Sequence, residues 1–303
     1  MDKPLNSLPG DPVSEPVLRM RELIAPRLKS LLVTLWGDAI LPHGGRVWLG
    51  CLPGLLAPLG FDEGAVRVSL QRLVAEGWLI SEEVGRKRDL RLAPGHMAET
   101  RRVQAAIYRD APPDWDGSWF LLQVAAKSAA SREALRRVLS QQGFAAFSPN
   151  VYLHPHADWP QIARVPGIAA HLDEVTAAFA AREVSGRTDL AALWDLPAIR
   201  ARWLEIGALL DLAASARGAE ARFACRVLLI HAVRRLVLAQ PSLPAALVAA
   251  DWPEAPMRRR LAEVYPQLAE ASRAWLDDHL LMSDGARPAW HGFEPPRFGR
   301  SEG

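Results

Sequence analysis

The sequence is poor in the residues that build disulfide frameworks and metal centres. Its 303 residues include two cysteines, Cys51 and Cys225, which are far apart and form no metal-ligand spacing. Both are expected to be reduced, buried thiols of the kind found in cytoplasmic proteins. A disulfide-stapled domain is therefore not expected.

The sequence also lacks long apolar runs and a strong charge of either sign. No run is long enough to span a bilayer, and the start, MDKPLNSLPGDPVSEP, is polar and proline-rich, unlike a secretory leader. We therefore expect a cytoplasmic protein with no membrane partner. The formal net charge is +2, so any contact with nucleic acid must come from a local basic patch.

Sequence motifs of enzyme chemistry are missing as well. There is no Gly-rich phosphate loop, no G-x-S-x-G and no H-E-x-x-H. His154, His156 and Asp158 are residue types that suit zinc or nickel, but their segment is predicted to be a loop with no evident third and fourth ligand. The sequence thus predicts no catalytic residue, no metal site and no cofactor.

The most informative stretch that is present is FDEGAVRVSLQRLVAEGWLISEEVGRKRDLRL, residues 61–92. Asp62 is a favourable residue for a helix N-cap, and Gly77 is favourable just after a helix end. Between them, apolar residues recur at helical spacing and predict one buried stripe: Val66, Leu70, Leu73 and Val74.

The opposite face of this predicted helix is polar. Arg67 and Gln71 can offer paired hydrogen-bond donors to base edges in a major groove, with Arg72 at the edge of the face. A hairpin is predicted next, with a turn at Gly85 and a basic tip that can contact phosphates or the minor groove: Arg86, Lys87 and Arg88. The alternative is a surface helix with solvated charges beside an ordinary hairpin.

The residues before this stretch predict the remaining parts of a DNA-binding domain. Residues 18–40 are predicted helical with an interruption at Pro26, 46–49 form a short strand that can pair with the hairpin, and 50–58 form a second short helix. This order is that of a winged helix-turn-helix over residues 18–92. Residues 1–17 before it are predicted to be a disordered tail.

After a connector with one helix, residues 93–113, a small α/β domain is predicted over residues 114–188. Residues 118–124 have strand character, and Ser131 is a plausible N-cap for a helix that ends at Gln142. The stretch Val175–Val184 is compatible with helix or strand.

The last third is predicted to be helical and then mobile. Residues 189–281 are rich in Ala, Leu and Arg and predict a helical domain, whose last two pieces lie around Pro266. Residues 282–303 are predicted to be a mobile tail. The fold class is therefore α+β.

Residues 32–92 resemble the PaaX family of transcriptional regulators, the phenylacetic-acid degradation repressors. The resemblance lies in WGD, HGGRVWLG, AVR-x-x-L-x-RL, EGWL and the turn GRKR. It continues through Asp114–Leu122, Leu193–Glu205 and His231–Pro253. Asp89-Leu90 departs from the aromatic residues that the family usually has after the turn, and Asp89 is expected to weaken the basic patch.

The resemblance implies a ferredoxin-like middle domain similar to the Cas2 nucleases. Those nucleases place an acidic residue at the end of the first strand to hold a metal, where this chain has Val124, Ala125 and Ala126. We therefore expect a scaffold without nuclease chemistry. A Cas2-like nuclease remains a disfavoured alternative. A winged helix that binds protein instead of DNA also remains open.

The resemblance also implies an effector, because an aryl-CoA thioester such as phenylacetyl-CoA releases the family from DNA. The candidate ligand residues here are His231, Arg234 and Arg235, with Trp203 as an aromatic wall. Adjacent arginines beside an apolar helix face can neutralise the phosphates of an acyl-CoA, although they can equally pair with acidic residues nearby.

The combined expectation is a homodimeric repressor of an aromatic-acid catabolic operon. It would bind double-stranded operator DNA and leave it when an aryl-CoA binds. A different acyl-CoA effector, or activation of transcription, would fit the same residues.

Overall fold

The structure, a computed structural model, describes residues 13–185, 189–293 and 296–299. The chain forms two compact units. Unit 1 comprises residues 1–110, 206–234 and 259–303, and unit 2 comprises residues 111–205 and 235–258. The helices predicted as a separate domain over residues 189–281 thus divide between the two units.

The first part of unit 1 has the predicted order of a winged helix. Its elements are α1 (Glu15–Ile24), α2 (Leu28–Leu35), β1 (Arg46–Trp48), α3 (Leu52–Leu56), α4 (Glu63–Ala75), β2 (Leu79–Val84) and β3 (Lys87–Leu92). Helix α1 begins at Glu15, inside the stretch predicted to be a disordered tail. Residues 1–12 of that predicted tail lie outside the described residues.

Helix α4 begins and ends as its sequence predicts. The Asp62 side chain accepts a hydrogen bond from the backbone N–H of Ala65 at 2.8 Å. At the other end, Gly77 has φ +71°, and its N–H donates to the carbonyl of Val74 while the N–H of Trp78 donates to that of Leu73. These two bonds form a Schellman motif, which satisfies carbonyls at the helix end.

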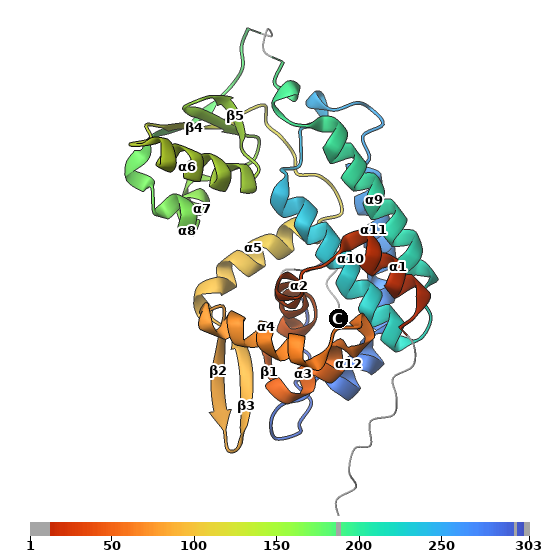
Figure 1. Ribbon diagram of the computed structural model, residues 1–303. Coiled ribbons are helices and arrows are strands. Elements are labelled where there is room, and N and C mark those ends of the chain that lie inside the picture. Colours follow the sequence, from red (N-terminus) through yellow and green to blue (C-terminus); the bar gives the residue numbers. More distant parts are fainter. Residues whose placement is uncertain (1–12, 186–188, 294–295, 300–303) are drawn as a thin grey trace, which may run out of the picture. The chain divides into compact units, whose positions relative to one another are not determined.

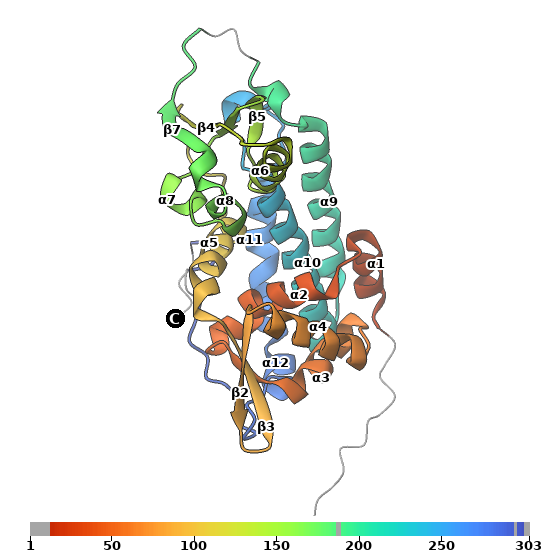
Figure 2. The ribbon, with the colours of Figure 1, turned by 60° about the vertical axis from the view of Figure 1, so that its left-hand side comes forward.

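Strands β2 and β3 form the predicted hairpin, with β1 at the far side of β3. Val84 pairs with Lys87, so the turn has two central residues, Gly85 and Arg86, and Gly85 has φ +61°. Glycine is required at this first position in type II′ turns. Figures 1 and 2 show the hairpin extending beyond α3 and α4, which exposes its tip.

The helical last third contains four α-helices in the described residues. They are α9 (Leu196–Ser215), α10 (Ala219–Ala239), α11 (Glu254–Ala271) and α12 (Arg273–His279). Pro266 lies inside α11, so the predicted break at this proline is wrong and the helix instead ends before the buried Ser272. Burial of the neighbours Tyr265 and Leu268 compensates for the hydrogen bond that a proline cannot donate.

The segment after α12 folds back onto unit 1. The carbonyl of Leu281 accepts a hydrogen bond from the N–H of Trp48 at 2.8 Å, and the N–H of Phe298 donates to the carbonyl of Tyr108 at 2.7 Å. Arg297 and Phe298 are both buried. The prediction of a mobile tail over residues 282–303 is therefore wrong for these positions, because their side chains complete the core.

In unit 2, four antiparallel strands form a sheet in the order β5-β6-β4-β7. The strands are β4 (Trp119–Val124), β5 (Ala145–Ser148), β6 (Val151–His154) and β7 (Val175–Ala181), and α6 (Ala129–Gln141) connects the first two. With α7 (Trp159–Ile162) and α8 (Pro166–Ala169) before β7, this is a ferredoxin-like arrangement (Figure 2). The ambiguous stretch from Val175 is thus a strand.

The first helix of this unit begins earlier than predicted. Its N-cap is Ser128, whose side chain accepts from the N–H of Ser131, while the Ser131 hydroxyl accepts from the N–H of Ser128. Ser131 is therefore the third residue of a capping box and not the cap itself. The connector helix before the unit, α5 (Met97–Ile107), lies where it was predicted.

Candidate nucleic-acid interface

The exposed face of α4 carries the residues predicted to contact bases. Arg67, Gln71 and Arg72 are all exposed, whereas Val66 and Leu70 are buried on the opposite side. The apolar stripe thus packs the helix against the domain and turns the polar face outward. An exposed polar helix face of this length can enter a major groove.

Arg67 is held by an exposed ion pair with Glu63, one helical turn earlier. Exposed pairs of this kind contribute about 0.2–1 kcal/mol, so a stronger acceptor can replace the glutamate. Arg72 has no ion pair among the residues that the structure describes. Helix α4 therefore presents Arg67, which is held weakly by Glu63, and Arg72, which is available to contact DNA.

The basic residues of the hairpin tip are not equivalent. Arg86 is exposed in the turn, and Arg88 pairs with Glu83 across the hairpin at 2.6 Å. Lys87 is turned back: its Nζ donates to the carbonyl of Ser283 at 2.7 Å and lies 4.6 Å from the centre of the Trp48 ring. Lys87 thus ties the hairpin to the segment after α12.

Asp89 has a different role from the one expected. Its carboxylate is buried, accepts a hydrogen bond from the Nε of Arg46 at 2.9 Å, and accepts another from the N–H of Ser283 at 3.1 Å. Because it points inward and is neutralised by Arg46, it does not subtract charge from the exposed tip. The expectation that it weakens the basic patch is corrected accordingly.

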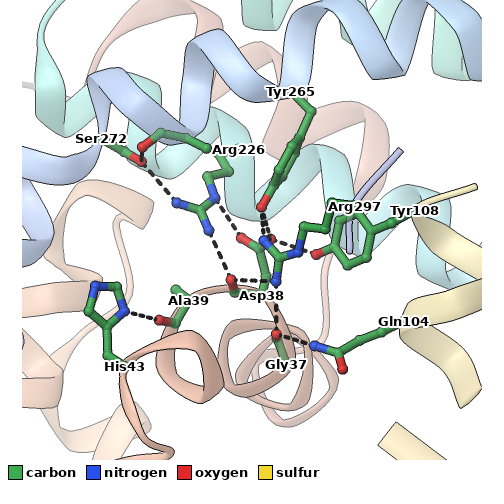
Figure 3. Close-up of polar contacts among 11 residues, drawn as sticks. Gly37, Asp38, Ala39, His43, Gln104, Tyr108, Arg226, Tyr265, Ser272 and Arg297 are labelled. Atoms are coloured by element: carbon green, nitrogen blue, oxygen red, sulfur yellow. Dashed lines mark hydrogen bonds and ion pairs between the residues drawn. The ribbon is translucent and has the colours of Figure 1, made fainter. Parts of the chain in front are cut away.

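Behind the interface, α2 continues into a π-helical turn, Trp36–Ile40, which holds a buried carboxylate. The Oδ1 atom of Asp38 accepts hydrogen bonds from Tyr108 at 2.6 Å and from Tyr265 at 2.7 Å (Figure 3). Arg226 and Arg297 lie 2.8 and 3.1 Å from its two carboxylate oxygens. We call these five residues the Asp38 cluster.

The charges in this cluster determine the protonation of Asp38. Burial alone would raise the pKa of its carboxyl group, but the guanidinium groups of Arg226 and Arg297 lower it. Hydrogen bonds from Tyr108 and Tyr265 act in the same direction, and the pKa lies below its ordinary value. Asp38 is therefore ionised at neutral pH and links α2 to α5, α10, α11 and the segment after α12.

Sequence reasoning missed the Asp38 cluster. Its residues are up to 259 positions apart, since Arg297 bonds to Asp38, and no local pattern connects them. One signal was available: Asp38 is the single charged residue in LLVTLWGDAIL, residues 31–41. A carboxylate inside so apolar a helix needs a buried partner, because an unpaired charge there is costly.

Two of the predicted ligand residues lie in unit 1 and take part in packing. His231 is fully buried, and its Nδ1 lies 3.0 Å from the hydroxyl of Thr34 in α2. Arg234 is half-buried, and its Nη1 donates to the hydroxyl of Ser30 at 3.4 Å. Burial lowers the pKa of Arg234 from its ordinary value.

The other two predicted ligand residues belong to unit 2. Trp203 is 4% exposed, and the guanidinium of Arg258 lies 5.0 Å from its ring centre. Arg235 is exposed. His231, Arg234 and Trp203 thus have packing contacts within their own unit.

No catalytic or metal site is evident in the described ranges. Val124, at the end of β4, is buried and is followed by two alanines, so the strand itself carries no carboxylate there. The Glu174 carboxylate nearby accepts a hydrogen bond from the N–H of Lys127 at 3.0 Å. The N–H of His156 donates to the Nδ1 of His154 at 2.9 Å, and no group of three or more His, Cys, Asp or Glu in the described residues could hold a metal ion.

The two cysteines are free and buried, as predicted. Burial raises the pKa of Cys51 to about 11 and that of Cys225 to about 12, so both are uncharged thiols. Within the described chain, every helix is too short or too polar to cross a bilayer.

Comparison with known families covers most of the chain. Residues 27–94 match a family described as PaaX-like protein, and residues 194–278 match the C-terminal domain of PaaX-like proteins. Residues 112–192 match the central Cas2-like domain of the PaaX protein. These matches confirm the three predicted parts: an N-terminal domain, a Cas2-like α/β domain and a helical C-terminal domain.

Two individual proteins are similar over most of their length. The transcriptional repressor PaaX of Escherichia coli (strain K12) is 32% identical over 282 residues, which are 89% of each chain. The solved structure of an uncharacterised protein from Mycobacterium tuberculosis is similar with a TM-score of 0.51 and 28% identity. That similarity covers 81% of this chain and 97% of the other.

Proposed function

The chain belongs to the PaaX family, and from this premise we propose that it represses an aromatic-acid catabolic operon of the phenylacetate type. The repressor binds double-stranded operator DNA in the cytoplasm. An aryl-CoA thioester such as phenylacetyl-CoA releases it. A different acyl-CoA effector and a role in activation are variants of this proposal, and the titration below tests the first of them.

The observation that carries the proposal is the exposed face of α4 beside the exposed hairpin tip. Arg67 and Gln71 read base edges in the major groove, where paired donors distinguish base pairs. Arg72, Arg86 and Arg88 contact phosphates or the minor groove. Lys87 contributes less directly, because its ammonium already bonds to the carbonyl of Ser283.

The proposed repressor acts as a homodimer. A single winged helix reads one short half-site, and two copies related by twofold symmetry read two half-sites with higher affinity and specificity. The thioester binds better to the arrangement that does not fit DNA. By linkage, it lowers the affinity for DNA by the same factor as DNA lowers the affinity for the thioester.

The test is a binding titration of the full chain on DNA from upstream of its own gene. Tight, sequence-specific binding is expected, with release by phenylacetyl-CoA but not by phenylacetate or coenzyme A alone. Specific binding that ignores phenylacetyl-CoA would retain the repressor and overturn this effector. Absence of specific binding at every salt concentration would overturn the assignment of a DNA reader.

The same titration separates the roles of two arginines. Arg67→Ala is expected to cost about 1–3 kcal/mol of binding and to flatten the preference at one base position. Arg86→Ala is expected to weaken all sequences alike and to lower the salt slope by about 1, since it removes a phosphate contact. Equal losses on operator and on random DNA for both variants would contradict this division.

A further inference from the structure

Unit 1 contains a cavity of about 320 Å³ next to the Asp38 cluster. Its walls come from α10, α11 and α12, from His43 after α2, and from the chain segment 288–293. A cavity of about 150 Å³ is enough for a benzene ring. This one can hold an aromatic acyl group, while a complete coenzyme A would have to extend outside it.

The wall formed by segment 288–293 is aromatic. The ring centres of Trp290 and His43 are 4.9 Å apart at 65°, and those of Trp290 and Phe293 are 4.9 Å apart at 84°. Pro266 and Leu276 line the cavity as well. Edge-to-face aromatic groups and flat apolar side chains favour a planar ring as the occupant.

A buried cation also lines the cavity. Arg226 is 2% exposed. Its Nη1 donates to the Ser272 hydroxyl and its Nη2 to the backbone carbonyl of Asp38, while its Nε lies 2.8 Å from the Asp38 carboxylate (Figure 3). A guanidinium has five N–H groups. The buried Nε atom thus has a charge partner in Asp38 but no hydrogen-bond acceptor of normal geometry among the described residues.

The cavity lining also carries Arg273, Glu270 and Asp277, so a positive excess arises only on the side of the Asp38 cluster, at Arg226. The Asp38 cluster contains two guanidinium groups and one carboxylate, an excess of one positive charge in a buried site. A buried donor without an acceptor costs about 1–3 kcal/mol, which a carbonyl oxygen in the cavity would recover. The acyl carbonyl of an aromatic thioester has this chemistry, with the ring directed to the aromatic wall.

We propose that this cavity binds the aromatic acyl group of the effector, with Arg226 donating to the acyl carbonyl and Trp290 and Phe293 enclosing the ring. The proposal rests on the proposed function, because it locates the site at which the thioester acts. It assigns the acyl group to residues other than His231, Arg234, Arg235 and Trp203, none of which lines this cavity.

The position of the cavity explains how its occupant affects DNA binding. The segment that encloses the cavity follows residues 281–283, which hold the hairpin through Lys87 and Asp89. Further along, the guanidinium of Arg297 lies 3.7 Å from the centre of the Phe293 ring and bonds to Asp38. An occupant of the cavity therefore touches a segment that contacts both the hairpin and the end of α2.

The contact with Asp38 is linked to the DNA-binding interface through helix α2. This helix packs directly against α4, whose exposed face carries Arg67. A shift of Asp38 thus reaches the recognition helix through one packed neighbour. A modest difference in affinity between two such arrangements is sufficient, because coupling free energies of about 1–3 kcal/mol change affinity 5–150-fold.

The experiment fills the cavity without touching the Asp38 cluster. Ala269, which lines the cavity, is replaced in Ala269→Phe, and the matched control is Ala274→Phe at an exposed position of α12. Phenylacetyl-CoA and acetyl-CoA are titrated calorimetrically against wild type and both variants, and operator affinity is recorded for each. A second variant, Trp290→Ala, opens the exposed rim and does not depend on core packing.

The expected result is that Ala269→Phe weakens phenylacetyl-CoA binding at least tenfold, Trp290→Ala weakens it severalfold, and Ala274→Phe leaves it unchanged. Acetyl-CoA should bind more weakly than phenylacetyl-CoA to wild type, because it lacks the ring. Equal binding of phenylacetyl-CoA to wild type and both cavity variants would overturn this site while the repressor and its effector stand. No binding to wild type would overturn the proposed effector itself, and this site with it.

Discussion

At the scale of single residues, the dominant feature of unit 1 is a carboxylate buried among two arginines and two tyrosines. Removing charges from water costs several kcal/mol per ion, and close partners compensate this cost only while all of them are present. Asp38 meets Arg226 and Arg297 within 3.1 Å. The loss of its charge would leave two guanidinium groups without a counterion in the core.

Asp38→Asn is therefore expected to reduce the free energy of unfolding by about 3–5 kcal/mol. The matched control is Asp211→Asn, which removes one partner of an exposed ion pair with Arg260 in the same unit. That change should cost no more than about 1 kcal/mol. Urea denaturation followed by circular dichroism measures both, and similar losses in the two variants would contradict the assigned role of Asp38.

The stability difference between wild type and Asp38→Asn is expected to depend on pH. Because the folded-state pKa of Asp38 is lowered, its stabilising contribution is present above the unfolded value of about 3.9 and is lost as pH falls through the folded value. The difference in stability between wild type and Asp38→Asn should thus be constant from pH 7 to pH 5. It should shrink below about pH 4, and a difference that grew in acid would refute the direction of the shift.

At the scale of secondary-structure elements, the interface depends on how α4 ends and the hairpin begins. Gly77 has φ +71°, and the two hydrogen bonds of the Schellman motif direct the chain into β2. A left-handed residue with a side chain costs about 1–2 kcal/mol at such a position. The space around Gly77 is open, so the cost comes from the backbone alone.

Gly77→Ala is accordingly expected to destabilise the chain by about 1 kcal/mol and to weaken operator binding, because the hairpin leaves α4 at this residue. Gly95→Ala is a suitable control, since Gly95 also has open space around it but no positive φ. Thermal unfolding and the operator titration measure both effects. A cost for Gly95→Ala equal to that for Gly77→Ala would show that backbone conformation is not the cause.

At the scale of the whole molecule, unit 1 is assembled from three separate stretches of the chain. The last of them returns to the winged-helix core, where Arg297 bonds to Asp38 and Phe298 packs against Tyr108 and Tyr265. The DNA-binding part is thus completed by residues more than 200 positions further along the chain. Its stability should depend on the carboxyl end.

A chain that ends at residue 296 is expected to lose at least about 3 kcal/mol of unfolding free energy, because it lacks the buried Arg297 and Phe298. A chain that ends at residue 299 keeps both side chains and serves as the control. Urea denaturation measures the two stabilities. If the shorter chain were as stable as the longer one, these contacts would not be part of the core.

The sequence alone determined the features that depend on neighbours along the chain. Asp62 and Gly77 delimit α4, and Gly85 sets the hairpin turn, because caps and tight turns are formed by hydrogen bonds within a few residues. Helical periodicity separated the buried Val66 and Leu70 from the exposed face of α4. The order of these elements was sufficient to predict a winged helix, and the resemblance of motifs such as HGGRVWLG and EGWL pointed to its family.

Only the tertiary structure decided which distant side chains meet. Lys87 and Asp89 lie two residues apart in a basic hairpin. Both nevertheless bond to Ser283, which is nearly 200 residues away in the sequence. Arg226 and Arg297 meet Asp38 from opposite ends of the last third of the chain. Burial and charge pairing between elements act across space, so no local pattern predicts them, and the candidate effector cavity became visible only with these contacts.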